Sequence, residues 1–406
     1  MTWFGNDIGF KAGNALDPFG WLRTGSRTVA FEYSGRYDQG LLLWDHSLSG
    51  TGAITFDSLT GGNTLSTGGT ASGAKAIRQT HEYHLYLPGR GRLSVSGFIF
   101  GTAATNLRRR HGLFEANSGA FLEQISTGIR LVTRSDVSGS VVDTAIEQAD
   151  WNIDKLDGTG ISGYTIDVTK ANALVIDNVG YNGARIRFGF LLGGRIVYAH
   201  EINNLNAITS FAIGTYDLPI RYEIENTGVT SGTNTMKASS CVVYNEDGGS
   251  VESGYQFTAN NGTTTKAVVA RSPVLSIQPK ATFGGLTNRS HSLLKKFDFL
   301  VKTNDILFEI VRNGTLTGAA FASVSANSVM NYDTTASAIT GGEILQSGYG
   351  PAGFGSNTQG SASEFLGRLV LTNDFAGTTP DILSLVATPM AGTATVSSAM
   401  AWEERR

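Results

Sequence analysis

Apolar and polar residues alternate with a period of two along much of the chain, which is the pattern of half-buried β-strands. In residues 185–190 the apolar positions are Ile186, Phe188 and Phe190, while arginines occupy the intervening positions 185 and 187. Two glycines at 193–194 follow, and residues 195–201 resume the strand pattern. This arrangement predicts a β-hairpin.

The same reasoning predicts strands along most of the chain from residue 76 onward. They are expected at residues 81–87, 92–100, 113–116, 120–123, 129–133, 218–225, 267–270, 274–277, 297–301, 306–311, 365–372 and 382–387. Short helices are predicted only at 141–148 and 169–174. Turn signals at Asn117-Ser118-Gly119 and Asn313-Gly314 predict tight connections.

These elements predict an all-β protein built as an antiparallel, jelly-roll-like β-sandwich with a second, smaller β domain. We expect the sandwich at residues 76–246 and the second domain at 247–406, after a turn-rich join. Residues 1–75 are predicted to form an extended N-terminal arm, because their aromatic residues are irregularly spaced and residues 60–73 are nearly all small and polar. The alternative is that this region adds a strand or two to the sandwich.

Composition narrows the class of protein. Charged residues make up 16 % of the chain, glycines number 51 and prolines 8, which is typical of a many-turned β protein. A net charge of −3 gives no drive toward nucleic acid. The single cysteine, Cys241, excludes a disulfide framework, and no apolar run reaches the roughly 18 residues that a membrane helix needs. We also expect no secretory signal peptide and no cofactor.

Residues 150–163 combine acidic, apolar and glycine residues in one short stretch. Asp150, Asp154 and Asp157 could bind calcium, but their intervals of four and three differ from the alternate spacing of an EF-hand loop. We therefore predict no metal site and expect these carboxylates to hold turns.

The same stretch carries apolar residues that could reach the core. We predict a rigid corner in which Trp151, Ile153 and Leu156 enter the sandwich core.

Catalytic signals are thin. The chain has neither a Gly-x-Ser-x-Gly elbow nor a Gly-Lys dipeptide of a phosphate-binding loop. Glu223 and Glu225 share one face of a predicted strand, as a glycosidase carboxylate pair could, but Arg221 lies on that face and would pair with them. We therefore predict a surface ion network and no enzyme activity.

Interaction sites have a few candidates. The basic run Arg108-Arg109-Arg110 could meet phosphate or an acidic neighbouring subunit, or lie in a solvated turn. Tyr349 and Phe354, in the glycine-rich residues 341–360 that we expect to form a long loop, could stack on sugars or simply hold that loop. Phe19 and Trp21 are anchor candidates in the predicted arm.

Several short motifs follow one another in a fairly specific order. They are Asp17-Pro18-Phe19-Gly20-Trp21-Leu22-Arg23, Arg78-Gln79-Thr80, Pro88-Gly89-Arg90, Arg108-Arg109-Arg110 with Gly112-Leu113-Phe114, residues 151–160, and Leu218-Pro219-Ile220-Arg221-Tyr222-Glu223-Ile224. Over residues 17–285 the chain resembles a family of largely uncharacterised virion structural proteins of tailed bacteriophages, with relatives in some large DNA viruses. It departs from the family at Trp21, where a polar or basic residue is frequent.

This resemblance implies a virion component and no catalytic residue. The expected function is structural: a symmetric homo-oligomer in the tail, collar or fibre-attachment region, or a head decoration protein, contacting its own copies and other virion proteins. The alternatives are a glycan-binding protein for host attachment and a polysaccharide-degrading enzyme.

Overall fold

The computed structural model describes residues 27–88, 90–179, 184–246, 254–353, 357–361 and 370–406. The chain divides into two compact units, Met1–Val251 and Glu252–Arg406. Within the described residues, all regular structure is antiparallel β-strand except one short 3₁₀ helix, η1 (Gln148–Asp150). The predicted all-β class is confirmed. The described residues contain no helix of the length and apolarity that spanning a membrane requires.

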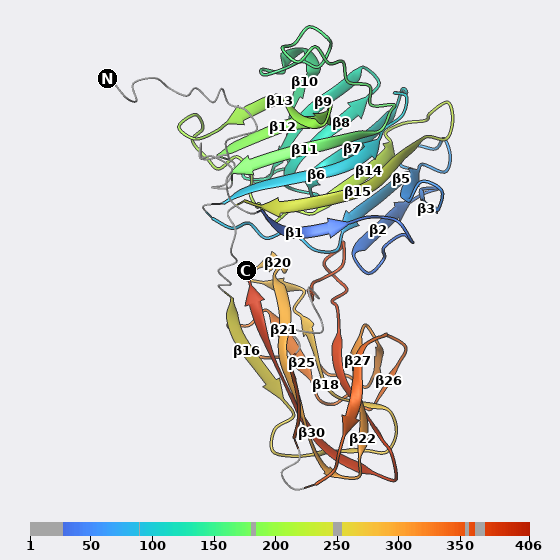
Figure 1. Cartoon of the computed structure of the whole chain (residues 1–406), viewed down its shortest axis with the longest axis vertical. Coiled ribbons are helices and arrows are strands. Elements are labelled where there is room, and N and C mark those ends of the chain that lie inside the picture. The colour runs from blue at the N-terminus through green and yellow to red at the C-terminus, as the bar shows by residue number, and fades with distance from the viewer. Residues whose placement is uncertain (1–26, 89, 180–183, 247–253, 354–356, 362–369) are drawn as a thin grey trace. The chain divides into compact units, whose positions relative to one another are not determined.

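The first unit contains an eight-stranded sheet (Figure 1). In spatial order its strands are β13 (Arg195–Asn203), β12 (Arg185–Leu192), β11 (Asn172–Val179), β6 (Gly91–Ile99), β15 (Thr235–Asn245), β4 (Gly62–Ser66) and β3 (Ala53–Asp57). The eighth strand, β1 (Thr28–Tyr33), also pairs with β15. The predicted hairpin is confirmed as β12 and β13, with Gly193 and Gly194 both at positive φ in the turn.

A seven-stranded sheet forms the other layer of this unit. Its strands, in spatial order, are β10 (Val142–Glu147), β9 (Gly128–Ser135), β8 (Gly119–Ile125), β7 (Leu107–Phe114), β14 (Ile220–Asn226), β5 (Lys75–Thr80) and β2 (Trp44–Ser49). β7 and β14 lie side by side near the middle of the sheet, and β10 and β2 are its two edges. The predicted turn at residues 117–119 joins β7 to β8.

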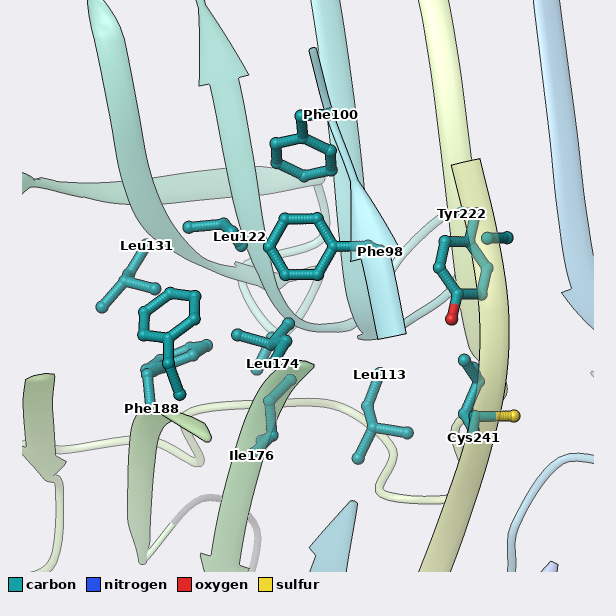
Figure 2. Packing of buried hydrophobic residues seen from close by; sticks show 14 of the residues in the cluster. Phe98, Phe100, Leu113, Leu122, Leu131, Leu174, Ile176, Phe188, Tyr222 and Cys241 are labelled. Atoms are coloured by element: carbon teal, nitrogen blue, oxygen red, sulfur yellow. The ribbon is translucent and has the colours of Figure 1, made fainter. Parts of the chain in front are cut away.

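The apolar core of the first unit lies between the two sheets. Figure 2 shows Phe98, Leu174 and Phe188 of the eight-stranded sheet packing with Leu113 and Leu131 of the seven-stranded sheet. Each strand contributes every second side chain to this layer, which is the alternation seen in the sequence. The result is a jelly-roll-like sandwich, as predicted.

The N-terminal region differs from the prediction of an arm. Between Thr28 and Ser66 the chain forms β1, β2, β3 and β4, which are strands of the sandwich, and β5 begins at Lys75. Phe31 and Trp44 are buried in the core and attach this region to it. In β4, which is otherwise polar, the side chain of Leu65 is also buried in the core. From Thr28 onward, the structure supports the alternative prediction, in which this region adds strands to the sandwich. Residues 1–26 lie outside the described residues.

Three other predicted elements of the first unit also differ. The predicted helix at 141–148 is largely the edge strand β10, and the one at 169–174 overlaps the start of β11. Residues 142–147 pair with β9, and the strand that begins at Asn172 pairs with β6. This pairing outweighs the weak local preference of both segments for helix. The predicted strand at 81–87 is irregular, with one isolated bridge from His84 to Leu218.

The second unit is a smaller sandwich. Its five-stranded sheet has the order β16 (Tyr255–Asn260), β30 (Ala394–Arg405), β21 (His291–Thr303) and β28 (Asn357–Ser361), with β17 (Lys266–Val268) also paired to β30. Its six-stranded sheet has the order β24 (Ala322–Ser323), β25 (Met330–Asp333), β18 (Ser272–Pro279), β29 (Leu383–Pro389), β22 (Ile306–Arg312) and β27 (Glu343–Gly350). Two two-stranded sheets complete it: β19 (Thr282–Phe283) with β20 (Leu286–Thr287), and β23 (Thr315–Thr317) with β26 (Ala338–Thr340).

The core of the second unit again lies between sheets, with Phe297 and Trp402 facing Leu385 and Phe308. The hairpin expected at Asn313-Gly314 is not formed. β22 pairs with β27 and β29, and the next strand, β23, pairs with β26. The expected long loop at 341–360 contains β27 and β28. Most of the strand predicted at 365–372 lies outside the described residues.

Candidate functional site

The seven-stranded sheet turns one face away from the core, and this outer face is charged. On β14 the core takes Tyr222 and Ile224, so that Arg221, Glu223 and Glu225 lie on the outer face. On β7, which pairs with β14, Glu223 faces position 110 and Glu225 faces position 108. Strand register therefore places the predicted carboxylate pair directly beside two arginines of the basic run.

Ten charged side chains from six strands meet on this face. We call them the charged lattice: Lys75, Arg108, Arg110, Glu123, Arg130, Arg134, Asp143, Arg221, Glu223 and Glu225. It spans β5, β14, β7, β8, β9 and β10, so each carboxylate is shared between neighbouring strands.

Glu223 is at the centre of the charged lattice and is only 1 % exposed. Its Oε2 accepts a hydrogen bond from Arg221 Nη2 at 2.6 Å, and its Oε1 accepts one from Arg110 Nη1 at 3.1 Å. The ammonium group of Lys75 lies 3.2 Å from the same Oε1. Burial alone would raise the pKa of Glu223, but Arg221, Lys75 and Arg110 together lower it to about 2.

The remaining pairs extend this arrangement toward β10. Glu123 accepts hydrogen bonds from Arg110 Nε at 2.8 Å and from Arg130 Nε at 2.6 Å. Arg134 binds Asp143 through two bonds, of 2.7 and 2.8 Å, which is the bidentate geometry that makes such pairs strong. Burial acts to raise the pKa of Asp143, but Arg134 outweighs it and the pKa is lowered.

Aromatic rings lie among these guanidinium groups. Phe114, Phe121 and Val132 form a separate buried cluster on the outer face. The guanidinium carbon of Arg221 lies 5.1 Å from the Phe114 ring centre, and that of Arg134 lies 5.2 Å from the Phe121 ring centre. Cation–π contact of this kind stabilises a guanidinium group that has lost water.

The charged lattice links neighbouring strands of the sheet through ion pairs. A glycosidase needs a carboxyl group whose raised pKa keeps it protonated until it donates its proton. The pKa of Glu223 shifts the opposite way, and both of its oxygens accept hydrogen bonds from arginines. Glu225 in turn accepts a 2.5 Å hydrogen bond from Arg108 Nη2. The arrangement suits rigid cross-strand pairing and not proton transfer by either residue.

The basic run at residues 108–110 lies within the strand β7, which corrects the solvated-turn prediction. The intersubunit contact stays a prediction, and Arg108 is the member of the run with a partly exposed side chain. Arg110 is buried among carboxylates of its own chain. Arg109 points to the opposite face of β7, where it donates to the Thr235 and Thr102 carbonyl oxygens and to Gln124 Oε1. Burial lowers the pKa of Arg109 to about 10. Neither side chain offers an accessible contact surface.

The corner at residues 150–163 is present, with one difference. Trp151 and Leu156 are buried in the core, but Ile153 is 40 % exposed and does not enter it. The Trp151 ring lies beside Phe190, and its Nε1 donates to the Ile146 carbonyl oxygen at 3.3 Å. The backbone N–H groups of Ile153 and Asp154 both donate to the Ala199 carbonyl oxygen of β13, which holds the backbone of the corner at this strand.

Two of the three carboxylates of this corner, Asp154 and Asp157, hold turns as predicted. Asp154 is buried and accepts backbone hydrogen bonds from Leu156 at 2.9 Å and Ser162 at 2.7 Å. Asp157 accepts a hydrogen bond from the backbone of Thr159, and Asp150 is exposed. In the described parts of the chain, no three His, Cys, Asp or Glu side chains gather as a metal site requires.

Tyr349 is the described member of the predicted sugar platform. It lies on the edge strand β27, is 70 % exposed, and borders a pocket of about 300 Å³ together with Asp305, Pro351 and Met390. Phe354, Phe19 and Trp21, the other candidate contact residues, lie outside the described residues.

Sequence reasoning missed five of the ten members of the charged lattice: Lys75, Glu123, Arg130, Arg134 and Asp143. Arg130 lies in the predicted strand at 129–133, Arg134 directly follows that strand, and Glu123 ends another predicted strand. Alternation, continued by one residue, could have placed the two arginines on one face. The partners could not be found that way, because they depend on which strands are neighbours.

Comparison with known proteins gives fold likenesses only. No family model matches the chain, and no curated protein matches it. Among solved structures, a β-glucanase from Bacillus licheniformis aligns at 12 % identity over 54 % of this chain and 98 % of its own, with a TM-score of 0.34. A pseudo β-1,3-glucanase of Mycobacterium tuberculosis gives 10 % identity, 53 % and 98 % coverage and a TM-score of 0.35.

A legume lectin-like domain from Entamoeba histolytica gives 13 % identity, 55 % and 100 % coverage and a TM-score of 0.32. At such identities and TM-scores, the activities and ligands of these proteins say nothing about the present chain.

Proposed function

We propose that this chain is a non-catalytic structural component of a virion, whose copies associate side by side through the first unit. The observation that carries the proposal is an exposed apolar segment at the edge of the seven-stranded sheet. We call it the leucine edge: Leu41, Leu42 and Leu43 in the turn before β2, and Leu48 within β2. These four side chains are between 44 % and 64 % exposed.

The position of the leucine edge favours association. β2 ends the sheet, with β5 as its neighbour on one side and no strand on the other among the described residues. An open edge presents unpaired backbone N–H and C=O groups, and proteins that stay monomeric usually protect such an edge with charge, proline or a bulge. Here apolar side chains accompany it, as at sites where proteins bind one another.

Low surface charge fits the same proposal. The lattice arginines pair with carboxylates of their own chain, and only 16 % of the residues are charged. Little charge repulsion therefore opposes the packing of identical copies, and a symmetric homo-oligomer is the expected assembly.

Light scattering after size-exclusion chromatography tests the association. The wild-type protein should form an oligomer, and the double variant Leu42→Ser, Leu48→Ser should shift to monomer. The matched control is Leu59→Ser, Ile161→Ser, which removes two nearly fully exposed apolar residues elsewhere in the first unit. A wild-type monomer at high concentration, or equal dissociation of the control, would contradict the proposal.

The virion assignment needs a separate test. Mass spectrometry of purified particles, followed by antibody labelling in electron micrographs, should detect the chain at a symmetric position of the particle. Its absence from particles that are infectious would exclude the structural role.

A second candidate function is glycan binding for host attachment, and Tyr349 favours it. An exposed tyrosine ring beside the Asp305 carboxylate offers a stacking surface and a hydrogen-bond acceptor to a sugar. Loss of glycan-array binding in Tyr349→Ala, with binding retained in Tyr255→Ala, would support it. Tyr255 is a comparably exposed tyrosine of the same unit.

A further inference from the structure

The eight-stranded sheet has an irregularity in β15 that no function described so far uses. β15 pairs with β6 up to Ala238 and again from Cys241, with a register shift between them. On its other edge β15 pairs with β4 up to Ala238 and with β1 from Cys241. Ser239 and Ser240 together oppose the single residue Gly97, so β15 holds one extra residue here, and both serines are exposed. A β-bulge of this kind changes the direction of side chains and is frequent beside binding sites.

Gly97 on β6 makes room for this bulge. A Cβ atom at position 97 would lie 2.1 Å from the hydroxyl oxygen of Ser239, so a side chain there and this hydroxyl exclude each other. The glycine therefore lets the Ser239 hydroxyl lie over the sheet, on the face turned away from the core.

A groove of about 930 Å³ lies at this point, within the range typical of ligand sites. Val95, Gly97, Ala173 and Val242, from three neighbouring strands, form a shallow floor of small side chains. Tyr244 borders the groove, as does Leu43 of the leucine edge. The floor is flat because its residues lie on adjacent strands and have small side chains, of at most three carbons each.

The polar groups of the groove are mostly neutral. Ser34, Ser239 and Ser240 contribute hydroxyl groups and Asn172 an amide. Among the described residues that line the groove, Glu32 is the only charged one. With no lysine, arginine or histidine in this lining, an anionic ligand such as a phosphate would meet only a carboxylate.

A peptide strand does not suit this place either. The floor strand β6 is paired with β11 on one side and β15 on the other, so its backbone groups are already bonded. Recognition must come from side chains, whereas an added peptide strand needs an open edge.

We propose that this groove binds a neutral oligosaccharide. The aliphatic floor takes the C–H face of a sugar ring, the serine hydroxyls exchange hydrogen bonds with the sugar hydroxyls, and the Glu32 carboxylate accepts from two of them. This site lies in the first unit and is distinct from the Tyr349 pocket. It does not rest on the proposed assembly role.

Binding is tested on the full-length protein with an array of neutral glucan, mannan, galactan and N-acetylglucosamine oligosaccharides of four to six units. Heparin fragments serve as the anionic contrast, and positive sugars are measured by calorimetry. Ser240→Trp fills the groove from an exposed position and should weaken binding at least tenfold. Glu32→Gln should weaken it about tenfold, as expected for a lost charge-assisted hydrogen bond.

The matched control is Ser138→Trp, the same change at an exposed position of the turn between β9 and β10, which should bind as the wild type does. Circular dichroism melting checks that all variants fold. No binding of any neutral oligosaccharide by the wild type at millimolar concentration would overturn the proposal, as would preferential binding of heparin. Binding that Tyr349→Ala abolishes and Ser240→Trp retains would assign the sugar to the other pocket and overturn it too.

Discussion

The replacement Glu223→Gln tests whether the charged lattice stabilises the first unit or performs chemistry. The amide keeps the size of the carboxylate but removes its charge, leaving Arg110, Arg221 and Lys75 around a neutral group. The amide has one acceptor oxygen where the carboxylate has two, so either Arg221 or Arg110 would lose its hydrogen bond in a position that is almost fully buried. Removal of one member of a buried charge pair is costly, because the other charge stays behind without compensation.

The magnitude follows from the pKa of Glu223, which falls from 4.5 to about 2 in the folded protein. At about 1.4 kcal/mol per pKa unit, the ionised form is favoured by about 3 kcal/mol. The arginine charges left without a partner in the variant lower its stability further, since breaking a buried ion pair typically costs about 3–5 kcal/mol of the free energy of unfolding. We expect Glu223→Gln to lower the free energy of unfolding of the first unit by about 3–5 kcal/mol at pH 7.

The pH dependence gives an independent check. Because the folded-state pKa is depressed, the stabilisation by Glu223 is present above pH 4.5 and is lost as the pH falls toward 2. The difference between wild type and variant should therefore shrink between pH 4.5 and the lowest pH at which both proteins fold. A stability difference that stays constant over this range would refute the linkage.

Urea unfolding at pH 7 and below pH 4.5 measures the effect, and hydrogen exchange of the β14 amide groups reports on the first unit separately from the second. Glu225→Gln is the matched control, since Glu225 is partly exposed and its loss should cost less than about 1 kcal/mol. A Glu223→Gln protein as stable as the wild type would refute the structural role. If the wild type released reducing sugars from a polysaccharide and Glu223→Gln abolished this, the residue would be catalytic.

The other predictions concern the core and the corner. Trp151→Ala should cost about 3–5 kcal/mol, measured by urea unfolding, because a buried aromatic side chain leaves a cavity; unchanged melting would contradict the corner. Gly160→Ala should destabilise by about 1–3 kcal/mol, because its Cβ would lie 2.0 Å from an oxygen of the Asp154 carboxylate; calorimetric melting decides. Burial lowers the pKa of both His46 and His111 to about 4, so the free energy of unfolding should fall as the pH drops from 6.5 to 4. His111→Gln should reduce that slope, and an unaltered slope would contradict it.

Strands with regular alternation could be predicted from the sequence. β6, the β12–β13 hairpin and β22 all have apolar residues at every second position and turn residues at their ends. β4 could not be predicted, since Leu65 is its single large apolar residue and its place depends on β15, about 170 residues later in the chain. β10 has Val142 and Ile146 four residues apart, which imitates helical spacing until β9 pairs with it.

The sites also contain features that the sequence could predict and features that it could not. Arg221 beside Glu223 followed from alternation within one strand, and so did the conclusion that the pair would be neutralised. The contribution of Glu123 and Arg110 required the register between distant strands. The groove could not be predicted at all, because the bulge at Ser239 and Ser240 interrupts the alternation on which the prediction relies.

The charged lattice has a consequence for how the first unit folds. A slip of β14 against β7 by one residue would turn Glu223 and Arg221 toward the apolar layer and Tyr222 toward solvent. Burial of unpaired charges makes that misalignment far less stable than the native pairing. Besides stabilising the finished fold, the ion pairs of the charged lattice therefore disfavour wrong strand alignments while the sheet is still being assembled.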